Sequence, residues 1–193
     1  MIKTYEMIMD ELSGYGNPKQ KLGRLVKKGI YIPIVRGLYE TDRNTPGYLL
    51  AGSIYGPSYL SFAFALSYYG LIPESVYTYS SATFDKKKKK IYQNFFGSFT
   101  YRDVPQAVFP KEFMIKQDKE YFFRIASPEK ALCDQLYIIS PAGTLKEMNS
   151  LLWEDLRMEK SDIMNLNVKV IECLAALYHS TNVNLLAKVM RKH

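Results

Sequence analysis

The residues near the start of the chain that are best suited to chemistry are bases and amides. Between Leu12 and Tyr39 the chain has six lysines and arginines and no acid. These bases are Lys19, Lys21, Arg24, Lys27, Lys28 and Arg36, and the amides Asn17 and Gln20 lie among them. Arginine pairs bidentately with guanine, asparagine and glutamine pair with adenine, and lysine suits phosphates. The combination favours nucleic acid as the partner.

A second basic segment is a run of lysines. Its members are Lys86, Lys87, Lys88, Lys89 and Lys90. Adjacent lysines repel one another, so the run is either a solvated loop or a sequence-independent contact with the phosphates of DNA or RNA. The aromatic residues that follow either stack on RNA bases or belong to the core of a sheet. They are Tyr92, Phe95, Phe96, Phe99 and Tyr101.

The chain has few of the residues that build hydrolytic or metal centres. His179 and His193 are its two histidines, and both lie late in the sequence. Cys133 and Cys173 lie in apolar helical patterns, so we expect buried free thiols in a reducing compartment. No glycine pattern of the GxGxxG, GxxxxGKS or GxxxxGKT type occurs. We expect no catalytic residue, no metal and no cofactor.

A nuclease with a carboxylate–metal site is the enzymatic alternative. Such chemistry needs acids that converge on Mg²⁺. The acids near the predicted sheet are Asp103, Glu112, Asp118 and Glu120. Asp118 and Glu120 fall at or beside a predicted hairpin turn, where exposure is the simpler explanation. We therefore do not expect an enzyme.

The elements that would position the first basic cluster resemble a helix-turn-helix followed by a small hairpin. Tyr5–Leu12 has apolar residues at helical spacing. A second helix is predicted over residues 18–28, because Asn17 suits the N-cap and proline suits the first helical position. Two short strands are predicted within 30–35 and 37–39. This order is typical of a winged helix-turn-helix.

The predicted second helix separates its apolar and polar side chains. At 3.6 residues per turn, Leu22, Leu25 and Val26 share one face. The opposite face carries only amides and bases, without the glutamates that commonly pair with lysines on surface helices. We expect DNA contact from Asn17, Gln20, Lys21, Arg24, Lys27, Lys28 and Arg36. Lys21 and Arg36 are placed for backbone contact more than for base edges.

The remainder of the chain predicts a larger α+β domain. We expect a winged helix DNA-binding domain over 1–42, a polar linker over 41–46, and an α+β domain over 46–193. In the larger domain a small β-sheet is flanked by helices and followed by a helical C-terminus. The expected strands lie at 76–84, 91–102, 113–115 and 121–125. The expected helices lie at 47–55, 61–69, 127–139, 145–156, 162–178 and 183–190.

Composition and hydropathy bear on the compartment. Hydrophobic residues make up 47% of the 193 residues and the net charge is +7, typical of a globular protein with a polyanionic partner. No stretch approaches the roughly 20 apolar residues that a membrane span needs. The acids Glu6 and Asp10 argue against a secretory signal at the N-terminus. We expect a cytoplasmic protein with no membrane partner.

Three stretches together carry a resemblance to a known family. They are residues 22–30 (LGRLVKKGI) with 36–39 (RGLY), residues 59–74, and residues 126–134 (ASPEKALCD). In this order, and over nearly the whole chain, they resemble the AbiEi antitoxins of type IV toxin–antitoxin systems. Tyr69 departs from the pattern, since related sequences often have histidine at that position.

The resemblance implies both an architecture and a function. It implies an N-terminal winged helix joined to a larger antitoxin domain. It implies a transcriptional autorepressor that binds double-stranded DNA at repeats in its own promoter. It also implies an antitoxin that counters a nucleotidyltransferase-like toxin, by contact with the toxin or through the toxin's RNA substrate. The alternative is a protein- or RNA-binding antitoxin module without sequence-specific DNA binding.

The matched stretches also have structural explanations. Ser127, Pro128 and Glu129 are typical of a helix start. Lys130 and Asp134 have the spacing of an (i, i+4) ion pair, which on an exposed helix would contribute a few tenths of a kcal/mol.

Overall fold

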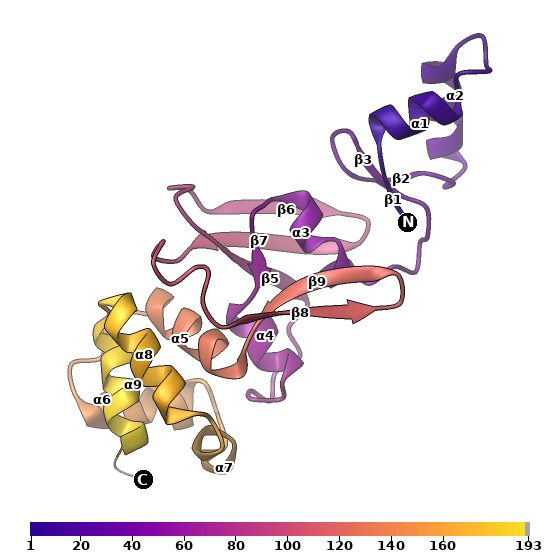
Figure 1. Cartoon of the computed structure of the whole chain (residues 1–193). Helices are drawn as coiled ribbons and strands as arrows, with labels where there is room; N and C mark the ends of the chain where they lie inside the picture. The colour runs from indigo at the N-terminus through magenta and orange to yellow at the C-terminus, as the bar shows by residue number, and fades with distance from the viewer. Residues whose placement is uncertain (192–193) are drawn as a thin grey trace.

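The computed structural model describes residues 1–191 and is a mixed α+β structure with two sheets (Figure 1). His193 lies outside the described residues. A small sheet and two helices form one end of the molecule, a six-stranded sheet forms the middle, and helices form the other end (Figure 1). An α+β fold was predicted, and this coarse class is confirmed.

The N-terminal module comprises residues 2–40. Its elements are β1 (Ile2–Thr4), α1 (Tyr5–Glu11), α2 (Pro18–Lys27), β2 (Ile32–Val35) and β3 (Leu38–Glu40). The strands form an antiparallel sheet in the order β1-β3-β2. Both helices and the β2–β3 hairpin were predicted, whereas β1 was not.

Local signals explain where α2 begins and ends. The Asn17 side chain accepts a hydrogen bond from the backbone N–H of Gln20 at 3.0 Å, as an N-cap residue does. Gly29 follows the helix with a φ of +72°, in the left-handed region that glycine adopts without strain. The predicted inward face is also confirmed, because Leu22 is buried with Ile8 and Leu12 in a small core, and the Leu25 and Val26 side chains pack against it.

The body of the molecule is built on the six-stranded sheet. Its strands are β4 (Tyr59–Leu60), β5 (Thr78–Thr83), β6 (Lys90–Asn94), β7 (Gly97–Asp103), β8 (Phe113–Asp118) and β9 (Tyr121–Ala126). They lie in the order β6-β7-β5-β4-β9-β8, with parallel pairing of β5 with β7 and of β4 with β9. The segment expected as strand over 91–102 is two strands, because the Asn94 side chain accepts from the Phe96 N–H and turns the chain.

Helices cover the sheet and complete the chain. Before and beside the sheet lie a 3₁₀ turn (Gly47–Leu49), α3 (Ala51–Ile54), α4 (Phe62–Tyr68) and α5 (Pro128–Ile138). After them come α6 (Leu145–Ser150), a π turn (Leu151–Asp155), α7 (Lys160–Met164), α8 (Val168–Tyr178) and α9 (Thr181–Arg191). The single helix expected over 162–178 is wrong, because Asn167 starts a new helix by accepting from the N–H groups of Lys169 and Val170.

The N-terminal module is attached to the body by packing and hydrogen bonds. Ile32 and Ile34 of β2 belong to the main core. The Tyr121 hydroxyl donates to Glu40 at 2.8 Å, and the Asn94 amide donates to the Ile34 carbonyl at 2.9 Å. These contacts orient the module so that its helices lie on the side away from the body (Figure 1).

Candidate nucleic-acid interface

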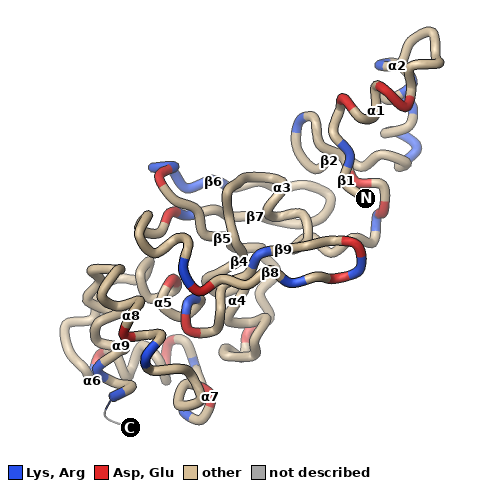
Figure 2. The backbone as a smooth tube through the Cα atoms, viewed as in Figure 1, with Lys and Arg blue, Asp and Glu red and all other residues tan. Residues whose placement is uncertain are grey.

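The outward face of α2 lies at the outer end of the N-terminal module, away from the six-stranded sheet (Figure 2). Gln20, Arg24, Lys27 and Lys28 are all exposed. Within residues 1–191, none of the three cations among them forms an ion pair. The C-terminal region, as far as Arg191, covers none of these side chains, so the face is free to meet a large ligand.

Asn17 has a defined structural role at the start of this face. Its carboxamide oxygen is occupied by the N–H of Gln20. Pairing with the edge of adenine uses that oxygen together with the amide N–H₂ group. The contact that the structure shows for Asn17 is therefore the helix cap.

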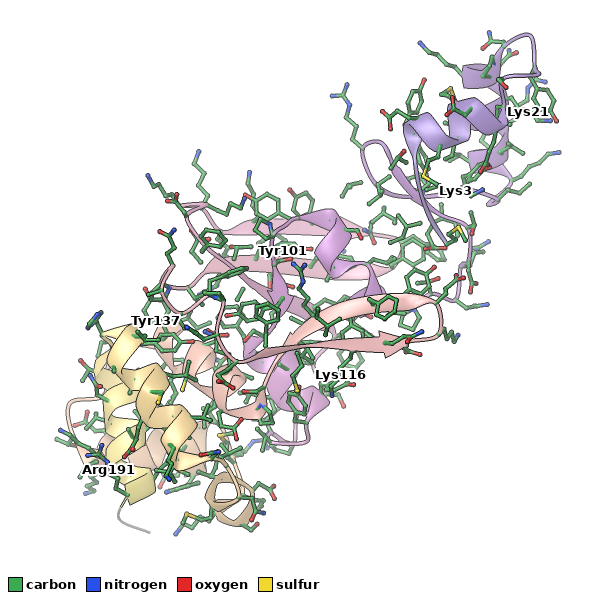
Figure 3. All side chains as sticks on the ribbon, viewed as in Figure 1. Lys3, Lys21, Tyr101, Lys116, Tyr137 and Arg191 are labelled. Carbon is green, nitrogen blue, oxygen red and sulfur yellow. The ribbon has the colours of Figure 1, made fainter. Side chains whose placement is uncertain are left out.

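Lys21 and Arg36 lie at the margins of the module. Lys21 is half-buried, and its ammonium lies 4.3 Å from the centre of the Tyr15 ring, a cation–π contact (Figure 3). Arg36 is exposed in the turn between β2 and β3. Both positions are compatible with the backbone contacts predicted for them.

The lysine run lies at the end of the connection between β5 and β6, with Lys90 as the first residue of β6, on the side of the body away from α2 (Figure 2). The backbone N–H groups of Lys86 and Lys87 donate to the Asp103 carboxylate at 2.7 and 2.6 Å. This carboxylate fixes the loop backbone and leaves the side chains of Lys87 to Lys90 exposed. The two basic segments therefore do not join into one surface.

The rings that follow the lysine run are mostly core. Phe96, Phe99 and Tyr101 are buried, which confirms the packing interpretation for them. Phe95 is 55% exposed, and the Arg43 guanidinium lies 5.0 Å from its ring centre. The structure does not present these rings as an open stacking platform.

The carboxylates considered for a nuclease are engaged separately. Asp103 holds the lysine loop and accepts from the Thr83 hydroxyl, and Asp118 accepts from the Tyr48 hydroxyl. In the part of the chain that the structure describes, no group of three or more His, Cys, Asp and Glu is arranged to hold a metal ion. None of the helices in residues 1–191 combines the length and apolar character needed to cross a bilayer.

The two cysteines differ. Cys133 is fully buried, and burial raises the pKa of its thiol well above the usual range. Cys173 was expected to be buried but is exposed on α8. The apolar pattern around it belongs to the neighbouring positions that face α5 and α9.

Sequence reasoning missed a buried polar cluster that joins three parts of the body. The Lys130 ammonium donates to the Val108 carbonyl at 3.1 Å and to the Tyr178 hydroxyl at 3.0 Å, and it lies 3.5 Å from the Asp134 carboxylate. Asp134 also accepts from the Tyr178 hydroxyl. The (i, i+4) pairing of Lys130 with Asp134 is confirmed, but both side chains have no exposed surface, so the small contribution of an exposed pair does not apply to it.

The carboxylate of this cluster has further partners. It accepts from the Ser61 hydroxyl at 2.6 Å and from the Tyr59 hydroxyl at 3.1 Å. Ser61 is the N-cap residue of α4 by position, but its side chain makes no cap bond and donates to Asp134 instead. Burial raises the pKa of Asp134 and lowers the pKa of Lys130, and the many hydrogen bonds oppose this cost of ionisation. The apolar run Ala131, Leu132 and Cys133, which follows Lys130 directly in α5 and is buried with it, is the signal in the sequence that favours its burial.

Neither protein-family models nor curated protein sequences gave a match to this chain.

Proposed function

We propose that the protein is a DNA-binding transcriptional autorepressor and antitoxin of a type IV toxin–antitoxin system, with residues 1–42 acting as a winged helix. The observation that carries the DNA-binding part is the exposed, acid-free face of α2. Its cations have no protein partner in the described residues, and its apolar side is fixed in a small core. A rigid helix whose outer side carries lysine and arginine side chains without ion-pair partners is suited to a DNA groove.

The dimensions of α2 suit the major groove. An α-helix with its side chains is about 10–12 Å across, and the major groove is about 12 Å wide. In this proposal Gln20 and Arg24 contact base edges, while Lys27 and Lys28 contact phosphates. Lys21 and Arg36 add phosphate contacts at the margins.

The antitoxin part of the proposal is supported by the sequence resemblance. In this account the body, residues 46–193, counters a nucleotidyltransferase-like toxin, and the N-terminal module represses the shared promoter. The attachment of the module through β2 and Tyr121 would let the body fix where α2 meets the duplex.

The test of DNA binding is a fluorescence-anisotropy titration of the full chain with duplex from its own upstream region. We expect the double variant Arg24→Ala, Lys27→Ala to weaken binding by at least tenfold. The matched control is Lys146→Ala, Lys169→Ala, which removes the same charge from exposed positions on α6 and α8. Equal affinity of the α2 variant and the wild type would overturn the assignment of α2. An equal loss of DNA affinity in both variants would show that binding depends on the net charge of the protein and not on α2.

A further inference from the structure

One half of the six-stranded sheet carries a polar face beside α4 and α5. β5 pairs with β7 in the register Thr78–Ser98, Ser80–Thr100 and Ala82–Arg102. Laterally paired residues share a face of a sheet and alternate along each strand. The intervening residues Phe99 and Tyr101 are buried on the opposite face. Hydroxyls and a cation therefore occupy positions of β5 and β7 on the face that α4 and α5 cover only in part.

A cavity of about 260 Å³ opens on this face. Its polar lining comes from four different segments of the chain. These residues are Thr78, Ser80, Lys89, Thr100, Arg102 and Gln135. Phe62, Val76 and Ile138 supply an apolar wall beside them. A site that combines two cations with hydroxyls and an apolar wall suits a ligand with both an anionic group and a flat apolar group.

Most of these polar groups are not used by the fold. Ser80 is engaged, since its hydroxyl donates to the Ser61 carbonyl at 2.8 Å and accepts from the Phe64 N–H at 3.2 Å. The Thr78, Thr100 and Gln135 side chains have no hydrogen-bond partner within residues 1–191. In the same described range, neither Lys89 nor Arg102 forms an ion pair.

Arg102 is the most informative member of the set. It is half-buried on β7, and desolvating a guanidinium without an anion is unfavourable. The neighbouring Asp103 points to the other side of the strand and is committed to the lysine loop. An anionic group of a ligand would give the Arg102 guanidinium the partner that the protein does not supply within residues 1–191.

The lysine run continues from this cavity. Lys89 lines the cavity, and the exposed Lys87 and Lys88 precede it along the same loop. A row of cations that leads away from an anion site matches a ligand with repeated phosphates. This continuity favours a single strand over a free nucleotide.

We propose that the cavity binds one unpaired nucleotide of a single-stranded RNA. Arg102 and Lys89 hold the phosphate of this nucleotide, and the base lies against the wall of Phe62, Val76 and Ile138. Thr78, Thr100 and Gln135 contact the ribose. Lys87 and Lys88 contact the next phosphates. This site is separate from α2 and does not depend on duplex recognition.

The experiment is an anisotropy titration of the full chain with a labelled, unstructured RNA 12-mer. We expect Arg102→Gln and the exposed variant Lys89→Gln each to weaken RNA binding by roughly five- to tenfold and to lower the salt dependence of binding. Arg124→Gln is the matched control, because Arg124 is an exposed arginine on β9 that does not line this cavity. Arg24→Ala, Lys27→Ala should leave RNA affinity unchanged, which separates this site from the DNA proposal.

Several results decide the question. Wild-type affinity in both Arg102→Gln and Lys89→Gln, or an equal loss in Arg124→Gln, would overturn the site. A DNA 12-mer of the same sequence should bind several-fold more weakly than the RNA, and equal binding of the two would contradict the ribose contacts. Because Lys89 is exposed, its variant reports on binding even where Arg102→Gln disturbs the fold.

Discussion

Helices α2 and α5 begin with the same signal but use their cations in opposite ways. Each has a side-chain cap followed by proline, Asn17–Pro18 in α2 and Ser127–Pro128 in α5. Arg24 and Lys27 of α2 are exposed and form no ion pair within residues 1–191, whereas Lys130 of α5 is fully buried against Asp134.

The difference comes from the width of the apolar surface of each helix. Only Leu22 is buried in α2, and its apolar stripe is narrow. In α5 six residues are buried, including Ala131, Leu132 and Leu136. On a helix with a narrow apolar face, a lysine stays exposed and can bind a ligand. On a helix surrounded by the core, a lysine is buried and needs an anionic partner within the protein. The chemistry of a cation is therefore set by the packing of its helix.

The strongest test of this contrast is Asp134→Ala. It leaves Lys130 buried without its carboxylate and removes the acceptor of three hydroxyls. We expect a loss of about 3–5 kcal/mol in the free energy of unfolding. Urea denaturation measures it, with the exposed Lys146→Ala as a control that should stay within about 0.5 kcal/mol. If the Asp134 variant had the same urea midpoint of unfolding as the wild type, the buried pair in α5 would not support the fold, and the contrast with α2 would be lost.

The matching test on α2 should move binding and not stability. Arg24→Ala, Lys27→Ala should lower the slope of log affinity against log salt by about one, because Lys27 contacts a phosphate in this proposal whereas Arg24 contacts base edges. The free energy of unfolding should change by no more than about 0.5 kcal/mol, since both side chains are exposed. A destabilisation comparable to that of the Asp134 variant would show that these cations also support the fold.

Glu40 is a buried carboxylate at the junction between the N-terminal module and the body, and its hydrogen bonds make stability depend on pH. Burial raises the pKa of Glu40, but hydrogen bonds from the N-terminal ammonium, the Asp42 and Thr41 N–H groups and the Tyr121 hydroxyl outweigh it, so the pKa lies below its ordinary value of 4.5. The stabilisation is therefore present above pH 4.5 and is lost as the pH falls through the lower folded value. Glu40→Gln should cost about 1–2 kcal/mol at pH 7, and the difference in unfolding free energy from wild type should narrow progressively as the pH falls below 4.5. Urea titrations at several pH values measure this, and the exposed Glu120→Gln should show no comparable gap.

The smallest effects concern the two caps. Asn17→Ala and Ser127→Ala each remove one side-chain bond to a helix N-terminus, so each should cost about 1 kcal/mol. Thermal unfolding of both variants provides the measurement. Asn17→Ala should also weaken duplex binding slightly, because α2 frays at the end that presents Gln20. A larger effect on binding than that of the Arg24, Lys27 double variant would mean that Asn17 contacts bases directly.

The sequence predicted those parts of the fold that depend on short-range signals. The start and end of α2 and the start of α5 follow from a cap, a proline and a glycine, all local. The inward face of α2 follows from the spacing of Leu22, Leu25 and Val26. These features need no knowledge of what packs against them.

Two missed boundaries, the turn at Asn94 and the helix start at Asn167, rest on local side-chain bonds, whereas the other missed features depend on contacts distant in sequence. β1 has three residues, too few for a periodic pattern, and forms only because β3 pairs with it across more than 30 positions. Ser61 has the pattern of a cap, but a carboxylate 73 positions away takes its hydroxyl. The cavity at Arg102 combines residues from β5, β7, α5 and the lysine loop, and only the sheet register brings them together.

An NMR titration of the full chain with duplex from its own upstream region locates the DNA-binding surface residue by residue. We expect amide shifts and line broadening to concentrate in residues 17–28 and at the β2–β3 turn. The lysine loop and the C-terminal helices should stay unchanged at the same DNA concentration. Perturbation of the lysine loop with α2 unaffected would contradict the account, because the duplex would then bind the body and not the module.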